Sequence, residues 1–180
     1  MKNYKLNTLG VMIDMSRNSV MSVEALKRYL PLLKKMGYNC VMLYTEDTYE
    51  VDGEPYFGYM RGRYSIEEMR ELDCYANSLG IEIIPCIQTL AHLDSYIRWS
   101  KVPFDQKNIL MVDDERTYEL IENMIRTVSE CFSTRRIHIG MDEAWGLGHG
   151  NYFTKNGLVD QIEIMRRHLE RVDGIVKKYG

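Results

Sequence analysis

Two adjacent carboxylates, Asp142 and Glu143, are the side chains in this sequence best suited to chemistry. They follow a short apolar run at residues 136–141, and neighbouring side chains at a strand end point in different directions. One carboxylate can then protonate a leaving group while the other orients the substrate, as enzymes that cleave glycosidic bonds require. Alternatively, one of the two caps a following helix. The pair on its own leaves both interpretations open.

Polar side chains also follow three earlier apolar runs. These runs cover residues 9–15, 38–44 and 81–87, and the polar residues at or after their ends are Asp14, Arg17, Glu46, Asp47, Gln88 and His92. Considered alone, His92 is an imidazole that either has ordinary hydrogen-bond partners or is exposed to solvent. Arg17 considered alone is a surface residue. Trp145 is either a platform on which a sugar stacks or a core residue. The repetition at four run ends is the feature that indicates a shared site.

The apolar runs alternate with amphipathic stretches, which predicts strands alternating with helices. We expect helices at about 22–37, 65–80, 114–132 and 158–178, with a short one near 93–99. Ser22 is a predicted N-cap, and Ser65 with Glu68 forms a capping box. This β-α order repeated four times indicates an α/β fold with a parallel sheet. In such folds the site lies at the carboxyl ends of the strands, which is where the polar residues fall.

Composition narrows the class of protein. The 180 residues suit one domain, and the net charge of -3 argues against a nucleic-acid footprint. No apolar run approaches the roughly 20 residues that cross a bilayer, and residues 1–9 carry no secretory signal. The four cysteines form no Cys-x-x-Cys pair, so we expect buried thiols in a reduced, cytoplasmic protein. The His and Asp spacing matches no metal-ligand pattern, and we expect neither a metal nor a cofactor.

Residues 137–145, IHIGMDEAW, resemble the His-x-Gly-x-Asp-Glu signature of family 20 glycoside hydrolases, the β-N-acetylhexosaminidases. Three more segments are similar to the first three barrel strands of that family, in the same order. They are residues 9–18 (LGVMIDMSRN), 44–47 (YTED) and 84–93 (IPCIQTLAHL). The resemblance therefore covers nearly the whole chain.

The resemblance implies a role for each site residue. Glu143 would be the general acid/base, and Asp142 would hold the 2-acetamido group of the sugar, whose own oxygen is the nucleophile. His92 and Asp47 would form a relay behind Glu143. The remaining residues would bind substrate: Arg17 would grip sugar hydroxyls, with Asp14 orienting it, and Glu46 and Trp145 would line the pocket.

Two positions depart from the pattern of the family. Asn18 stands where many members have histidine, and Glu46-Asp47 stands where many have two aspartates. The second departure leaves open which of the two carboxylates faces His92, and we favour Asp47. The choice between N-acetylglucosamine and N-acetylgalactosamine is not fixed by these residues.

The family has an eight-unit TIM barrel of about 250 residues, whereas only four β/α units are expected here. We therefore expect residues 1–180 to form the N-terminal half of a barrel, inactive in isolation, with an open face on which a homodimer can form. The parent would be an exo-β-N-acetylhexosaminidase that hydrolyses terminal N-acetylhexosamine from glycans. The alternatives are a non-catalytic, self-associating half barrel and, less favoured, a glycosidase with two enzyme carboxylates.

Overall fold

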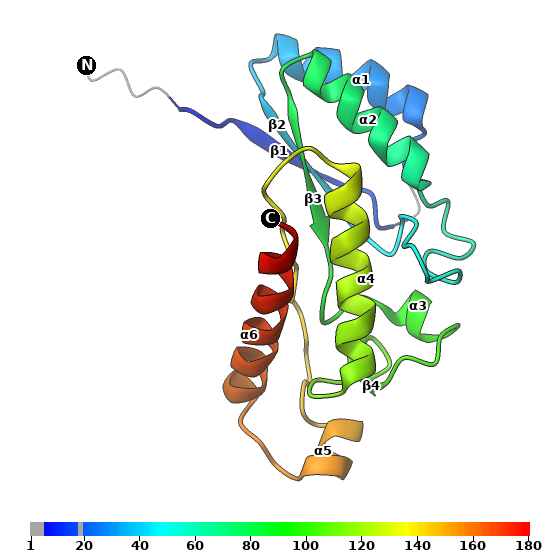
Figure 1. The fold of residues 1–180 in the computed structure, drawn as a ribbon, viewed down its shortest axis with the longest axis vertical. Helices are drawn as coiled ribbons and strands as arrows, with labels where there is room; N and C mark the ends of the chain where they lie inside the picture. Colours follow the sequence, from blue (N-terminus) through cyan, green and yellow to red (C-terminus); the bar gives the residue numbers. More distant parts are fainter. Residues whose placement is uncertain (1–5, 18–19) are drawn as a thin grey trace.

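A computed structural model describes residues 6–17 and 20–180, so Asn18 lies outside the described residues. Strands β1 (Gly10–Asp14), β2 (Cys40–Glu46) and β3 (Glu82–Ile87) form a parallel sheet in that order. The connecting helices are α1 (Val23–Lys35) and α2 (Ile66–Ser78), and α4 (Glu115–Cys131) and α6 (Gln161–Tyr179) follow later in the chain (Figure 1). The prediction of an α/β fold with a parallel sheet is confirmed.

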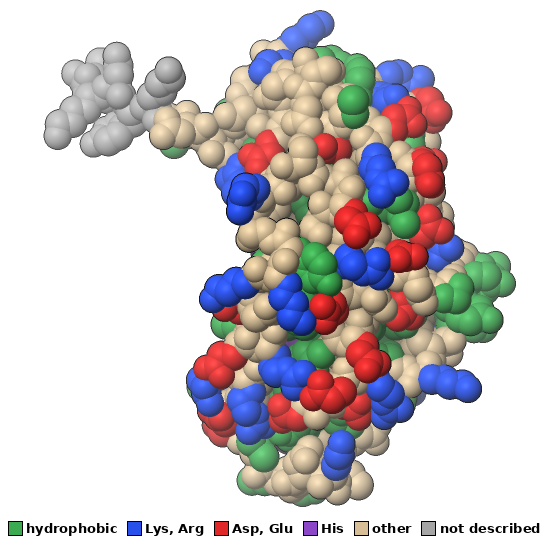
Figure 2. All heavy atoms as spheres, in the orientation of Figure 1, with side chains coloured by type: hydrophobic (Ala, Val, Ile, Leu, Met, Phe, Trp, Pro, Cys, Tyr) green, Lys and Arg blue, Asp and Glu red, His purple; other side chains and the backbone are tan. Residues whose placement is uncertain are grey.

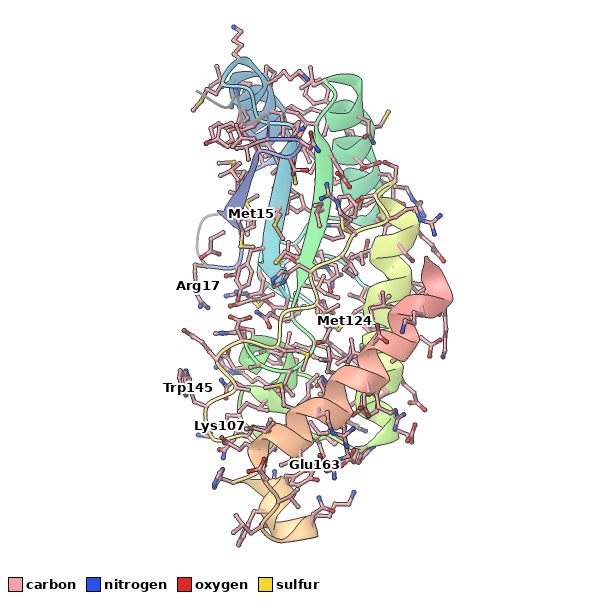
Figure 3. The ribbon with its side chains drawn as sticks, turned by 90° about the vertical axis from the view of Figure 1, so that its left-hand side faces the viewer. Met15, Arg17, Lys107, Met124, Trp145 and Glu163 are labelled. Atoms are coloured by element: carbon pink, nitrogen blue, oxygen red, sulfur yellow. The ribbon has the colours of Figure 1, made fainter. Side chains whose placement is uncertain are left out.

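The helices pack in a row against the sheet. Helix α1 contacts α2, α2 contacts α4 and β3, and α4 contacts α6. In Figure 3, α4 and α6 lie to one side of β2 and β3, and neither lies on the opposite side. The first strand alternates between exposed and half-buried residues, and Met12 is 48% exposed. The strand β1 is therefore an edge whose apolar side chains are only partly covered by the described residues.

The two predicted N-caps, Ser22 and Ser65, are confirmed in detail. The Ser22 side chain accepts a hydrogen bond from the amide of Ala25 and caps α1. Ser65 and Glu68 make both hydrogen bonds of the capping box at α2. These side chains satisfy amide groups that have no partner inside the helix, which is why helices begin there.

The fourth predicted strand, residues 136–141, is wrong as an extended strand. The segment makes a single parallel bridge, between Cys86 and His138, so the described sheet has three strands rather than four. Pro85 offers the reason: its carbonyl accepts from the amide of His138, but it has no N–H to extend the ladder on that side. Gly140 and Met141 then turn away with φ values of 74° and 85°. Pro85 itself lies within β3, opposite Leu43 and just before the register shift between β2 and β3.

Short elements occur between the longer helices and strands. Helix α3 (Asp94–Ile97) is the short helix expected there. An antiparallel hairpin of β4 (Phe104–Gln106) and β5 (Ile109–Leu110) and the helix α5 (Asn151–Asn156) were not predicted. Strands of two or three residues are too short to show a periodicity in sequence.

The surface agrees with the balanced composition. Acidic and basic side chains intermingle over the face that Figure 2 shows. Among the described residues, no helix is both long enough and apolar enough to cross a membrane. Cys40, Cys86 and Cys131 are buried as predicted, whereas Cys74 is exposed.

Candidate active site

The polar residues at the strand ends meet around the imidazole of His92. Its Nδ1 lies 3.5 Å from Oε1 of Glu46, and its Nε2 lies 3.5 Å from carboxylate oxygens of both Asp142 and Glu143. The side chain of His92 is 13% exposed, so it forms a mostly covered link between a buried acid and two exposed ones. The convergence predicted from the strand order is therefore present in the structure.

Backbone strain is concentrated at this point. Glu46, His92 and Glu143 have φ values of 47°, 59° and 51°, in the left-handed region that residues other than glycine rarely adopt. Such conformations persist only where the surrounding structure fixes them, and they cluster at functional sites. Three of the four residues in contact share this feature, which supports a functional rather than a purely structural arrangement.

Asp142 is held by a buried neutral network. The amide nitrogen of Gln88 donates to Asp142 Oδ1 at 2.6 Å and to the hydroxyl of Tyr44 at 2.9 Å. The Gln88 oxygen accepts from the amide of Met141 at 3.1 Å. A side chain at Gly140 would clash with Gln88, because a Cβ there would lie 2.3 Å from the Gln88 oxygen. The network therefore fixes both the carboxylate and the backbone before it.

The protonation of Asp142 follows from these contacts. Partial burial raises the pKa of Asp142, but the hydrogen bond from Gln88, its own backbone and the nearby His92 outweigh that effect and leave the pKa below its ordinary value. Asp142 is thus a carboxylate near neutral pH. Its side chain is 51% exposed, so a ligand can reach it.

Glu143 lies beside Asp142 but in a different setting. Its side chain is 60% exposed, and its carboxylate faces Nε2 of His92. The amide of Trp145 donates to its backbone carbonyl at 2.7 Å, which closes the turn that presents it. An exposed acid next to an imidazole is suited to exchanging a proton with a bound substrate.

The prediction that Asp47 faces His92 is wrong, because Glu46 occupies that place. Asp47 accepts a hydrogen bond from Nε of Arg61 at 3.1 Å instead. The strand β2 has a register shift between Tyr44 and Glu46, and a bulge of this kind re-aims the side chains that follow it. Burial raises the pKa of both Glu46 and Asp47, while arginines beside them act in the opposite direction.

Arg17 is paired with Glu46, at 3.1 Å between Nη1 and Oε1, and its own side chain is 63% exposed. Asp14 accepts hydrogen bonds from the amide and hydroxyl of Ser16, and no direct contact with Arg17 is found among the described residues. Burial raises the pKa of Asp14, but the Ser16 hydrogen bonds and the charge of Arg17 bring it below its ordinary value. The orienting partner of Arg17 is therefore Glu46 rather than Asp14.

Trp145 is 81% exposed, which rules out the core alternative. Figure 3 shows Arg17 and Trp145 on the same side of the molecule. The use of Trp145 as a platform on which a sugar stacks stays a prediction.

Two residues of the site were missed in sequence. Tyr44 donates to Glu46 and accepts from Gln88, and Arg61 binds Asp47 and the backbone of Ser16. Tyr44 carried a usable signal, since it ends an apolar run beside the acidic residues. Arg61 lies in a long loop, where nothing in the spacing indicates its partner. Among the described residues, no group of three or more His, Cys, Asp or Glu side chains is arranged to hold a metal ion.

Comparison with known proteins decides the family. The profile of the glycosyl hydrolase family 20 catalytic domain matches residues 8–180. The chain belongs to glycosyl hydrolase family 20. Hexosaminidase D of Bos taurus is 27% identical over 131 residues, which are 69% of this chain and 38% of that protein. Hexosaminidase D of Homo sapiens is 26% identical over 134 residues, or 71% of this chain and 28% of that protein.

Solved structures of the family share the fold. A GH20 exo-β-N-acetylglucosaminidase from Vibrio harveyi superposes with a TM-score of 0.80 at 21% identity, over 96% of this chain and 34% of that one. A chitobiase from Flavobacterium johnsoniae gives 0.80 at 22% identity, over 96% and 30%. The chain thus spans about a third of the length of these relatives.

Proposed function

We propose that this chain carries the general acid and the acetamido-orienting residue of a β-N-acetylhexosaminidase that acts on terminal N-acetylhexosamine of glycans. One observation carries the proposal: two adjacent acids are presented differently, Asp142 held by Gln88 and Glu143 open beside His92. Family membership supports the same chemistry.

In the proposed reaction, Glu143 enters as the carboxylic acid and gives its proton to the glycosidic oxygen. The acetamido oxygen of the substrate attacks C1 as the leaving group departs, which forms an oxazolinium ion. Asp142, an anion, holds the acetamido N–H and stabilises the positive charge that develops there. Glu143, now a carboxylate, takes a proton from water as the water attacks C1, and the product keeps the β configuration.

The other residues support these two. His92 connects Glu143 to buried Glu46, so it relays charge between the exposed acid and the interior. The exposed guanidinium of Arg17, anchored by Glu46, is placed to bind two sugar hydroxyls. Asp47, assigned to the relay from sequence, acts instead through Arg61 in this proposal. Trp145 offers an indole face to the sugar or to the leaving group.

We further propose that residues 1–180 form half of a (β/α)8 barrel. The exposed edge of β1 and the half-exposed Met12 support this arrangement, because a closed barrel covers both. On this proposal the isolated chain hydrolyses substrate negligibly, since one wall of the pocket is missing. The same open edge favours the second candidate, a non-catalytic domain that self-associates as a homodimer. We also propose a cytoplasmic location, on the basis of the unpaired cysteines.

The test uses the protein expressed from its complete gene and a chromogenic N-acetyl-β-glucosaminide and N-acetyl-β-galactosaminide. Glu143→Gln is expected to lower kcat by about 10³-fold or more, because it removes the acid of the first step and the base that activates water in the second. Glu170→Gln, at an exposed site on α6, is the matched control and should retain full activity. Full activity in Glu143→Gln would refute the role assignment.

A second substrate separates the two glycosidase mechanisms. A β-glucoside with the same leaving group lacks the acetamido nucleophile, so the proposal predicts almost no turnover. Comparable turnover of the glucoside would favour the two-carboxylate mechanism instead. Light scattering on residues 1–180 tests the second candidate, which predicts a dimer or larger species without hydrolysis.

A further inference from the structure

The β4–β5 hairpin lies between the two loops that carry the candidate catalytic residues. One loop follows β3 and contains His92, and the other contains Asp142 and Glu143. The proposed reaction uses no side chain of the hairpin. Its contacts on both sides nevertheless determine how far apart the two loops lie.

Asp105 of β4 holds the second loop. Its side chain is 2% exposed, and its Oδ1 accepts from the amides of Gly150 and Tyr152 at 3.0 and 2.9 Å. Its Oδ2 accepts from the amide of Gly148 at 2.5 Å. A buried carboxylate that accepts three backbone N–H groups makes strong, charge-assisted hydrogen bonds. Gly150 is required here, because a Cβ would lie 2.1 Å from the Asp105 carbonyl oxygen.

Two flanking residues of β4 extend this attachment. The side chain of Gln106 donates to the carbonyl of Gly146 at 3.3 Å, and that of Asn151 donates to the carbonyl of Phe104 at 3.0 Å. The attachment therefore begins three residues after Glu143 and one after Trp145.

The other side of the hairpin holds the first loop. The amide of Leu110 donates to the carbonyl of Leu90 at 2.9 Å, and the amide of Leu93 donates to the carbonyl of Asn108 at 3.4 Å. These contacts flank His92. Both loops and the hairpin also share a hydrophobic cluster that is separate from the main core and contains Leu90, Ala91, Ile109, Met111, Val112, Leu147, Tyr152 and Ile164.

We propose that Asp105 is a positioning residue that keeps Glu143 in contact with His92 by fixing the 146–152 loop to the hairpin. The inference rests on the proposed function. Asp105 binds the amides of Gly148 and Gly150 in that loop and the amide of Tyr152 in the first turn of α5, and none of the three belongs to the sheet or to α4. Loss of its charge therefore loosens the loop and leaves the main core in place.

Hydrogen exchange of residues 1–180, followed by NMR, tests this without any need for activity. In Asp105→Asn, an amide NH₂ replaces one acceptor, and we expect the amides of Gly148, Gly150 and Tyr152 to exchange at least about ten-fold faster while α4 amides change less. The matched control is Asp73→Asn, which alters a buried aspartate on α2 that binds Asn77 and Ser133. The control should not selectively accelerate the loop. Equal acceleration of loop and α4 in Asp105→Asn, or none, would overturn the proposal.

Kinetics on the protein from its complete gene give the second readout. Asp105→Asn should lower kcat at least about ten-fold with KM little changed and should alter the pH profile of kcat, because Glu143 no longer rests against His92. Asp73→Asn should do neither. If Asp105→Asn does not fold, Gln106→Ala removes one outer contact, and the same selective exchange at Gly146 to Gly148 is expected; its absence contradicts the proposal. An inactive wild type refutes the proposed function, whereas the exchange result stands independently.

Discussion

The pairs Glu46–Asp47 and Asp142–Glu143 have the same chemistry in sequence and opposite settings in the structure. The first pair is 3% and 1% exposed and is bound by Arg17 and Arg61. The second pair has side chains that are 51% and 60% exposed, and among the described residues their hydrogen-bond and ion-pair partners are Gln88 and His92. Burial raises the pKa of both acids in the first pair, whereas the pKa of Asp142 lies below its ordinary value. The first pair is thus the framework, and the second is the part that meets substrate.

The largest effect on stability is expected from breaking the buried pair. Arg61→Ala leaves the Asp47 carboxylate buried without its cation, and Asp47 Oδ2 already has no hydrogen-bond partner among the described residues. We expect the free energy of unfolding to fall by about 3 kcal/mol, as for other buried pairs that lose one partner. Arg126→Ala, at an exposed pair with Asp52, is the control and should cost about 0.5 kcal/mol. Denaturant unfolding of both variants measures these losses of free energy of unfolding. Equal losses would contradict the framework role of the Glu46–Asp47 pair.

His168, a buried residue outside both acidic pairs, shows how burial makes stability depend on pH. His168 accepts from the Tyr118 hydroxyl and donates to the Thr89 carbonyl, and burial lowers its pKa to about 4. Because the folded pKa is below the unfolded value of about 6.5, its contribution to stability is complete above pH 6.5 and is lost as pH falls toward 4. The loss amounts to as much as about 3 kcal/mol.

The measurement compares wild type with His168→Gln, which keeps a donor to Thr89 but cannot be protonated. The stability difference between the two should shrink by up to about 3 kcal/mol between pH 7 and pH 4. A difference that does not depend on pH would show that His168 is not held neutral by burial.

A smaller effect on the free energy of unfolding is expected at Gln88, the neutral residue that binds Asp142 of the exposed pair. Gln88→Leu removes the hydrogen bond to Asp142 and leaves the Tyr44 hydroxyl without that donor. The free energy of unfolding should fall by about 1–2 kcal/mol. The pKa of Asp142 should rise, because the Gln88 hydrogen bond is one of the contacts that lower it. An NMR titration of the Asp142 carboxyl group checks this, and an unchanged pKa would remove Gln88 from the account.

Much of this architecture is readable in sequence, and the parts that are not have physical reasons. The caps at Ser22 and Ser65 and the three apolar strands depend on local chemistry, so they were predicted. Glu46, and not Asp47, lies beside His92 because of a bulge in β2. The alternation of side chains along a regular strand does not reveal such a bulge in sequence. The fourth predicted strand is reduced to one bridge because the nitrogen of Pro85, which has no N–H, faces residues 136–141, and sequence does not show which edge of a strand a proline faces. The role of Asp105 depends on amides more than 40 residues away in the chain.

The central claim is that Glu143 protonates the leaving oxygen, and leaving-group dependence tests it most directly. In Glu143→Gln, kcat/KM for a dinitrophenyl N-acetyl-β-glucosaminide should remain near the wild-type value, because dinitrophenolate departs without a proton. For a methyl or sugar leaving group, kcat/KM should fall by at least about 10² to 10⁴-fold. An equal loss with both kinds of leaving group would contradict the assignment of Glu143 as the general acid.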